Sequence, residues 1–336
     1  MTNRPETAPQ TDASVSEHGL RRDQRKREKR DVSGWLVLDK PVGMTSTHAV
    51  AIVKRAFAAK KAGHAGTLDP LASGVLPIAL GEATKTVPFV MEGRKTYRFT
   101  VRWGVETDTD DAEGRAIATS ELRPGEPAIC EALSAYVGTV MQVPPRYSAI
   151  KIAGERAYDL AREGEEVVLE ARPVEIERLD FLRSPDADHA EFSAACGKGT
   201  YVRAIARDLG RALGTYGHVV ALRRTSVGPF TEAIAVTLDA LPTAEKTDIA
   251  HPACASSLHP VDAALSALPQ VSVSLADAAR LARGQVALLR GRDAPIVNGV
   301  VSVLAQGRLV ALADAEGGEL RPRRIFNIRE ARPNAA

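Results

Sequence analysis

The sequence predicts an α+β fold made of two domains of unequal size. Its 336 residues are 44% hydrophobic, which is enough for a full core and for about two domains. Residues 95–104 and 189–196 alternate between apolar and polar side chains, as strands with one buried face do. Between such runs lie segments whose apolar residues recur at spacings of three and four, which is typical of helices. A proline-rich stretch at 235–268 precedes a shorter C-terminal part.

The expected elements follow one another in a mixed order. The apolar run at 35–38 predicts a strand, and Ser46 or Thr47 can cap a helix that extends to about Ala59. Residues 63–74 contain too many glycines and prolines for a long helix or strand, so they predict a structured loop. The remaining expected elements are strands at 75–80, 95–104, 147–152, 174–183, 189–196 and 219–227, a short helix at 82–91 interrupted near Pro88, and helices at 127–137 and within 197–214.

The chain divides into four regions. Residues 1–33 form a polar tail, whose segment 21–30 carries seven basic and two acidic residues, so we expect disorder. This tail is either a solubilising segment or a non-specific arm for phosphates. Residues 34–235 form the larger domain, 236–269 form a connector, and 270–330 form a small β-rich domain.

Charge and cysteine usage narrow the class of protein. The net charge of +2 neither requires nor excludes nucleic acid, because RNA binding depends on local basic surface. Cys130, Cys196 and Cys254 lie far apart without a CxxC pair, so we expect neither a disulfide framework nor a zinc site. No apolar run reaches the roughly 18 residues of a membrane span, and the N-terminal residues lack the hydrophobic core of a signal peptide, so we expect a cytoplasmic protein without membrane contact.

The loop at 63–74 presents one carboxylate, Asp69, among small and apolar residues. Pro70 restricts Asp69 to extended backbone, while Gly66 and Gly74 permit tight turns around it. An isolated Asp-Pro pair is most often a turn that accepts local backbone hydrogen bonds. A reactive carboxylate is the alternative, and the surrounding sequence favours it.

Five separated blocks of the sequence resemble the bacterial tRNA pseudouridine-55 synthase family, also called the TruB family. The blocks, in chain order, are GHAGTLDPLASGVLP with GEATK, KTYRFTVRWG with TDTDDAEG, VPPRYSAIKIAGERAYDLAREG, GTYVRAIARDLG and ALRRTSVGPF. The resemblance covers about residues 34–230. It implies a catalytic domain built on a mixed, mostly antiparallel sheet with flanking helices, and a PUA-like RNA-binding domain at 270–330.

The resemblance also implies an activity and roles for six residues. The activity is isomerisation of a flipped-out uridine at position 55, in the T loop of transfer RNA. Asp69 is implied as the nucleophile, Tyr97 as the aromatic that packs on the uracil, and Arg203 as the cation paired with Asp69. His64 is implied to help hold the displaced base, with Tyr201 and Leu222 lining the base pocket. We expect a monomer with no obligatory protein partner.

The chemistry of the implied reaction agrees with these residue types. The enzyme must break the N-glycosidic bond, turn the uracil and join C5 to C1′, with no redox change and no group from outside. We therefore expect no cofactor, and the sequence contains neither a Walker loop nor a GxGxxG fingerprint. The carboxylate can attack C1′, attack C6 or remove a C2′ proton, and these three routes remain open. The Tyr97 hydroxyl can relay the proton that leaves C5.

Other interpretations of the same residues remain. Considered alone, Arg203 is a surface helix charge, Tyr97 a core aromatic and His64 a capped loop histidine. The acidic run at 106–114 lacks the spacing of an EF-hand, so we expect a turn between strands and no metal site. Seven basic residues near the site fit contacts to RNA phosphates, although each alone is more often an ordinary surface cation: Lys40, Lys60, Lys61, Arg146, Lys151, Arg223 and Arg224.

Alternative functions follow from the same features. One is a tRNA-binding folding factor whose catalysis is dispensable. Another is a pseudouridine synthase that acts on a different RNA, such as ribosomal RNA. A carboxylate glycosidase is disfavoured because the sequence near Asp69 offers no second paired carboxylate.

Overall fold

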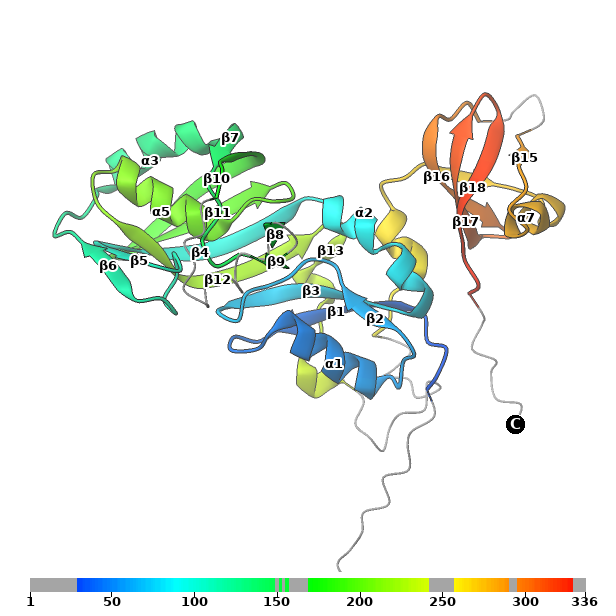
Figure 1. Cartoon of the computed structure of the whole chain (residues 1–336), viewed down its shortest axis with the longest axis horizontal. Helices are drawn as coiled ribbons and strands as arrows, with labels where there is room; N and C mark the ends of the chain where they lie inside the picture. The colour runs from blue at the N-terminus through cyan, green and yellow to red at the C-terminus, as the bar shows by residue number, and fades with distance from the viewer. Residues whose placement is uncertain are drawn as a thin grey trace, which may run out of the picture.

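The computed structural model describes residues 29–148, 169–241, 257–289 and 295–328, and the backbone of four residues between 151 and 156. A large domain contains a nine-stranded sheet, and a small C-terminal domain contains a five-stranded sheet (Figure 1). This arrangement confirms the predicted α+β class. Most of the predicted tail, residues 1–28, lies outside the described residues, as do Cys254 and much of the connector. Within the described residues, no helix is long and apolar enough to cross a membrane.

The large sheet is mixed and mostly antiparallel, as expected. Its main path runs β1-β3-β12-β4-β11-β10-β7, with β2 added beside β3 and β13 beside β12. Only β3 and β12 are parallel neighbours in this sheet. The strands are β1 (Gly34–Lys40), β2 (Ala62–His64), β3 (Ala72–Leu80), β4 (Lys95–Trp103), β7 (Gly138–Gln142), β10 (Arg172–Asp186), β11 (His189–Cys196), β12 (Gly217–Val227) and β13 (Phe230–Thr231).

Three helices pack on one face of this sheet. They are α1 (Ser46–Ala56), α3 (Glu126–Leu133) and α5 (Val202–Ala212). Each contributes an apolar stripe to the main core, where Val53, Ile129 and Ile205 meet Phe99 and Phe192 of the strands. The hydroxyl of Thr45, one residue before the predicted cap, accepts the His48 amide at the start of α1.

The opposite face of β1 and β3 is covered by later parts of the chain. Trp35 and Val37 pack there with Val90 of α2 (Val87–Glu92), Val261 of the 3-10 helix η5 (Val261–Leu265) and Leu312. The amide of Asn327 donates to the Glu82 carboxylate at 2.7 Å, and Lys85 donates to the Ile325 carbonyl at 2.8 Å. These contacts attach the small domain beside α2, at one end of the molecule (Figure 1).

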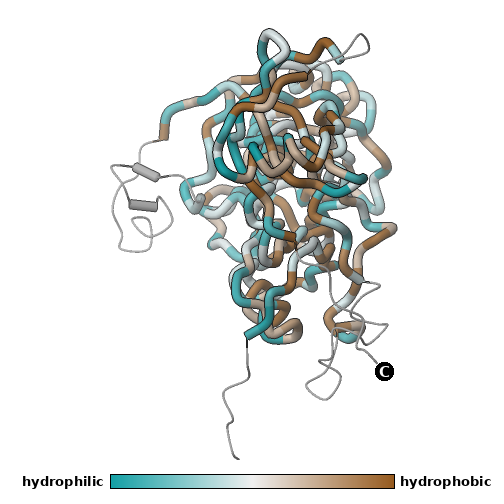
Figure 2. Tube along the Cα trace, turned by 90° about the vertical axis from the view of Figure 1, so that its right-hand side faces the viewer, coloured by the Kyte–Doolittle hydropathy of each residue, from teal (hydrophilic) through white to brown (hydrophobic). Residues whose placement is uncertain are grey.

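The small domain has its own core and sheet. The strand order is β14-β16-β17-β18-β15, and Val271, Leu281, Val303 and Leu320 are buried within the core. Figure 2 views the molecule from this side and shows brown apolar and teal polar stretches alternating along the chain. The elements are β14 (Gln270–Ser272), α7 (Leu275–Ala282), β15 (Ala287–Leu288), β16 (Gly299–Ala305), β17 (Arg308–Glu316) and β18 (Glu319–Ile325).

One predicted strand differs from the structure, and two other features were not predicted. The strand predicted at 147–152 is wrong at its start, where Tyr147 and Ser148 form bends, and β8 (Lys151–Ile152) pairs only with β9 (Glu155–Arg156). Strand β7 was not predicted, because its apolar residues show no clean alternation: Met141 lies exposed at the sheet edge and Val140 is half-buried. A short hairpin formed by β5 (Val105–Thr107) and β6 (Ala116–Thr119) was not predicted either.

The helix predicted at 82–91 and the end of the tail also need adjustment. The chain forms a 3-10 helix at Gly81–Lys85 and then α2, with the break at Thr86. Pro88 occupies the first turn of α2, where its missing N–H has no helical partner to lose. At the end of the predicted tail, Val32 is buried and the Arg30 amide donates to the Ala58 carbonyl.

Candidate active site

The loop between β2 and β3 presents the Asp69 carboxylate on a fixed backbone. The Ser46 hydroxyl donates to the Leu68 carbonyl at 2.9 Å and accepts the Leu68 amide at 2.8 Å. On the other side, the Gly43 amide donates to the Pro70 carbonyl at 2.8 Å. The Asp69 side chain itself remains 38% exposed. The residues around Asp69 are therefore anchored while its carboxylate stays accessible to a ligand.

Arg203, in the first turn of α5, holds this carboxylate from the side. Its Nε lies 3.0 Å from Asp69 Oδ2, and its Nη1 lies 3.2 Å from Asp111 Oδ2. The guanidinium also donates to the carbonyl oxygens of Thr109 and Tyr147, both at 2.9 Å. The Arg203 side chain is only 6% exposed, so the interpretation as a surface charge is wrong. Its planar array of donors bonds several acceptors at once and sets the direction of the Asp69 carboxylate.

Arg203 begins a stripe of three arginines along one side of α5. Residues four apart share a helix face, and each arginine of the stripe meets an acidic residue of the hairpin region. The pairs are Arg203 with Asp111 at 3.2 Å, Arg207 with Asp110 at 2.9 Å, and Arg211 with Glu106 at 2.5 Å. Burial raises the pKa of Asp110 to about 6, against the opposing effect of Arg207. The acidic run at 106–114 thus joins two strands, as expected, and also docks against α5.

Tyr97 lies beside this pair on the helix-covered face of the sheet. Its ring is partly buried and packs against the main core. Burial raises the pKa of the Tyr97 hydroxyl, and the nearby guanidinium of Arg224 acts in the opposite direction. Asp69 is close enough to raise the pKa of Tyr97 further. The structure therefore brings Tyr97 and Asp69 into one electrostatic environment.

The other three predicted residues lie on elements next to those that carry Asp69, Tyr97 and Arg203. His64 ends β2, and burial together with the Arg224 charge lowers its pKa, so its imidazole is neutral. The Tyr201 backbone exchanges two hydrogen bonds with the Gln142 side chain, and burial, with a smaller contribution from Asp69, raises the pKa of its hydroxyl. Leu222 is 8% exposed and lies opposite Ala72 and Phe99 in the sheet. The six predicted residues thus come from β2, the loop after it, β4, β12, and α5 with the residue before it.

Two of the basic residues that were expected to fit contacts with RNA phosphates are instead bonded within the protein. Lys40 is fully buried and donates to the carbonyls of Pro41 and Met44 at 2.8 and 2.7 Å. Burial is the main cause that lowers the pKa of Lys40, to about 8, while Asp69 opposes it. Arg223 is held by both oxygens of Asp39, at 3.0 and 2.9 Å, and by Glu232. These two cations are therefore engaged within the protein.

The buried partners of the site residues were not predicted from the sequence. Asp111 and Arg207 lie in segments that look like an acidic turn and an amphipathic helix, and nothing local links them. The spacing of Arg203, Arg207 and Arg211 at intervals of four was the available signal for a charged helix face. Among the described residues no group of three or more His, Cys, Asp or Glu side chains is arranged to hold a metal ion.

Comparison with known proteins identifies relatives along most of the chain. Residues 54–202 match the TruB family pseudouridylate synthase N-terminal domain, and residues 203–266 match the tRNA pseudouridylate synthase B C-terminal domain. The chain is 62% identical over 304 residues to tRNA pseudouridine synthase B of Bradyrhizobium diazoefficiens, covering 90% of this chain and 88% of that protein. It is 55% identical over 305 residues to the protein of the same name from Agrobacterium fabrum, covering 90% and 97%.

Solved structures resemble most of the chain as well. A structure of an H/ACA RNP bound to a substrate RNA containing 2′-deoxyuridine aligns with a TM-score of 0.69 at 26% identity, covering 88% of this chain and 86% of that one. A Cbf5-Nop10-Gar1 complex aligns with a TM-score of 0.68 at 27% identity, covering 87% and 84%. The similarity therefore extends over both domains.

Proposed function

The chain belongs to the TruB family of tRNA pseudouridine synthases, and we propose that it isomerises the uridine at position 55 in the T loop of transfer RNA. As a member of this class it is an isomerase that forms pseudouridine in transfer RNA. The proposed position rests on the sequence blocks described above, which resemble the pseudouridine-55 enzymes.

The ion pair between Asp69 and Arg203 carries the proposed mechanism. A carboxylate that is 38% exposed, held at 3.0 Å by a guanidinium that is 6% exposed, has one open side for a ligand. We assign Asp69 as the nucleophile and Arg203 as the cation that pairs with it and directs it. Such a pair places a reactive oxygen in a defined direction, which lowers the entropic part of the barrier.

The reaction needs only groups that this chain supplies. The N1–C1′ bond breaks, the uracil turns, the C5–C1′ bond forms, C5 loses its proton and N1 gains one. Asp69 can serve by attack at C1′, by attack at C6 or by removal of the C2′ proton, and the three routes share the same oxygen. No redox partner or transferred group enters this balance, so we propose that no cofactor takes part.

The remaining site residues fit recognition of a base that has left its helix. Tyr97 offers an aromatic face for stacking on the uracil, and stacking of this kind tolerates rotation of the base. His64, neutral in its buried position, suits the space left by the displaced nucleotide. Tyr201 and Leu222 would then line the pocket around the uracil.

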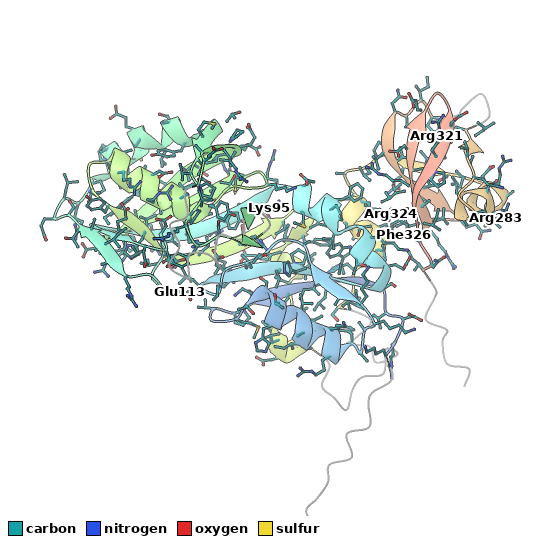
Figure 3. All side chains as sticks on the ribbon, in the orientation of Figure 1. Lys95, Glu113, Arg283, Arg321, Arg324 and Phe326 are labelled. Carbon is teal, nitrogen blue, oxygen red and sulfur yellow. The ribbon has the colours of Figure 1, made fainter. Side chains whose placement is uncertain are left out.

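We propose that the small C-terminal domain contributes to RNA binding. A groove of about 1090 Å³ separates it from the region of α2. Five cations and one acid line the groove: Lys61, Lys85, Arg94, Arg323, Arg324 and Glu92. Figure 3 shows Arg324 and Phe326 on the side of the small domain that faces α2, whereas Arg283 lies on its far side. A basic groove of this kind favours contact with phosphates of the T stem-loop.

We further propose that the enzyme acts as a cytoplasmic monomer. Both described cysteines, Cys130 and Cys196, are free thiols, which fits a reducing compartment. The proposed site is assembled from a single chain, so it requires no second copy.

Tritium release from transfer RNA labelled at uridine C5 tests the function directly. We expect release by the unchanged protein at the T-loop uridine and none by Asp69→Asn. Asp180→Asn is the matched control, because Asp180 is a partly exposed β10 residue paired with Arg178 at 3.0 Å. The activity of this variant should equal that of the unchanged protein. Tight binding of transfer RNA without release would favour the folding factor, and release from another position would refute the assignment to uridine 55.

A further inference from the structure

Arg224 lies on β12, between β3, which follows the loop that carries Asp69, and β4, which carries Tyr97. In the register of the large sheet it lies opposite Gly74 of β3 and opposite Tyr97 of β4. Directly opposed residues of neighbouring strands project from the same face, so Arg224 and Tyr97 share the side on which Asp69 lies. A Cβ atom at Gly74 would lie 2.2 Å from the Arg224 carbonyl oxygen. The two strands therefore approach more closely than another residue at position 74 would allow.

The Arg224 guanidinium is bonded to the loop and lies beside the tyrosine. Its three carbonyl acceptors are Val75 at 2.8 Å from Nε, Gly66 at 3.1 Å from Nη2, and Thr67 at 3.3 Å from Nη1. In the sheet register the Arg224 side chain lies beside Tyr97, and each group acts on the pKa of the other. Because a guanidinium has donors only, a phenol oxygen beside it can only accept.

The charge of Arg224 is buried, and no carboxylate of the described residues is in contact with it. The residue is 1% exposed and forms no ion pair with a carboxylate among the described residues. Burial lowers the pKa of Arg224, while Tyr97 and Asp69 act in the opposite direction. A buried cation with only neutral acceptors is costly to keep, and neutral side chains would anchor a loop at lower cost. The charge itself is therefore the feature that needs an explanation.

We propose that Arg224 is a positioning residue that acts through Tyr97, holding its phenol oxygen in place and favouring the phenolate that removes the C5 proton. This inference rests on the proposed isomerase function and adds the group that prepares Tyr97. Asp69 and Arg203 act on the sugar or on C6, whereas Arg224 acts on the last proton transfer.

The proton transfer is balanced with water as its only outside reagent. Tyr97 first loses its proton to solvent, and the positive charge at Arg224 stabilises the resulting phenolate. After the C5–C1′ bond has formed, the C5–H bond breaks and the phenolate oxygen takes the proton. The electron pair of that bond forms C5=C6 and moves the C6=N1 pair onto N1, which takes a proton from water. This chemistry requires a base of sufficient strength beside C5, which a neutral phenol is not.

The test compares Arg224→Gln and Arg224→Lys with Arg223→Gln as a matched control. Arg223 is the adjacent residue of the same strand, projects from the opposite face and is neutralised by Asp39 and Glu232. The first readout is the single-turnover rate of C5 tritium release between about pH 6 and pH 10. The second is the absorbance titration of phenolate near 295 nm, with Tyr97→Phe subtracted to isolate Tyr97 among six tyrosines.

The expected results separate a role in Tyr97 chemistry from a role in folding. The unchanged protein should gain about tenfold in rate per pH unit until Tyr97 is ionised. Arg224→Gln should lose about tenfold or more near neutral pH, and both its rate plateau and its phenolate titration should shift to higher pH. Arg224→Lys, which keeps the charge, should retain most of the original profile, and Arg223→Gln all of it.

Three results would overturn the inference. One is an unchanged pH profile and unchanged Tyr97 titration in Arg224→Gln. If that variant does not fold, Arg224→Lys in a Tyr97→Phe background decides: its rate should equal that of Tyr97→Phe alone, and an additive loss contradicts action through Tyr97. A rate of the unchanged protein that does not depend on pH is the third. Absence of any tritium release from the unchanged protein would instead refute the proposed function.

Discussion

Replacing Arg203 with lysine should separate the charge of this side chain from its geometry. The guanidinium makes four contacts, with the carboxylates of Asp69 and Asp111 and with two backbone carbonyls at 2.9 Å. A lysine ammonium is a single point and reaches only some of these acceptors. Losing two hydrogen bonds from a charged donor, each worth about 1.5 to 3 kcal/mol, with partial recovery by the ammonium, predicts a net loss of about 2 to 4 kcal/mol in the free energy of unfolding.

The same substitution should slow the chemical step more than it weakens RNA binding. The Asp69 carboxylate would lose the bond from Nε that directs it, and a misplacement of the order of 1 Å costs about 100-fold in rate. Single-turnover tritium release at saturating enzyme measures the chemical step, and filter binding measures the affinity for transfer RNA. We expect a rate about 100-fold lower with an affinity within about threefold of the unchanged protein.

Arg183→Lys provides the control for this substitution. Arg183 forms two bonds with Glu191 at 2.8 and 2.7 Å, but its side chain is 68% exposed on the large sheet. An exposed pair contributes about 1 kcal/mol or less, so both stability and rate should stay nearly unchanged. A rate for Arg203→Lys within about fivefold of the unchanged protein would refute the argument that the fork of donors directs Asp69.

Three further predictions concern stability. The pKa of buried Lys40 is lowered to about 8 from 10.5, so between these values the unfolded chain binds more protons and the stability of the protein rises with pH. Relative to Lys40→Met, urea unfolding should show a gain of about 2 kcal/mol from pH 8 to 9.5. A difference that does not depend on pH would contradict the burial argument. In Gly74→Ala the new Cβ would combine a φ of 98° with a distance of 2.2 Å to a backbone oxygen, whereas at Gly199 the φ is 90° and the surrounding space is open. Thermal unfolding should therefore show a much larger loss of stability for Gly74→Ala than the roughly 1 to 2 kcal/mol expected for Gly199→Ala. Arg207→Met should cost about 3 to 5 kcal/mol in urea unfolding, because it leaves the buried carboxylate of Asp110 without its partner, and a loss under about 1 kcal/mol would show that the pair is solvated.

Local patterns predicted most of the elements that build the site. The alternation of Tyr97, Phe99 and their neighbours identified β4, because one face of that strand is buried. The glycine-rich stretch at 63–74 was expected to be a structured loop, and the anchored segment around Asp69 lies there. The expected helix in 197–214 is present as α5, since its apolar stripe recurs at helical spacing.

Long-range partners could not be predicted in this way. Arg207 and Asp110 are 97 residues apart, and Arg224 and Gly66 are 158 apart, so no spacing rule connects them. The ionic character of 106–114 was visible, but a charge run alone is usually a solvated face. Lys40 and Arg224 were interpreted as surface cations because composition does not reveal which charged side chain the packing encloses.

The sequence by itself determined the fold class, the family resemblance and the loop that presents Asp69, because apolar periodicity and turn residues act over a few neighbouring positions. The tertiary structure decided which charges are buried and which side chains meet. The register of β12 against β3 and β4 sets Arg224 opposite Gly74 and Tyr97, and the docking of α5 against the acidic hairpin sets Arg203 between Asp69 and Asp111. Such contacts depend on how strands and helices pack over the whole domain, and that packing is a property of the complete chain.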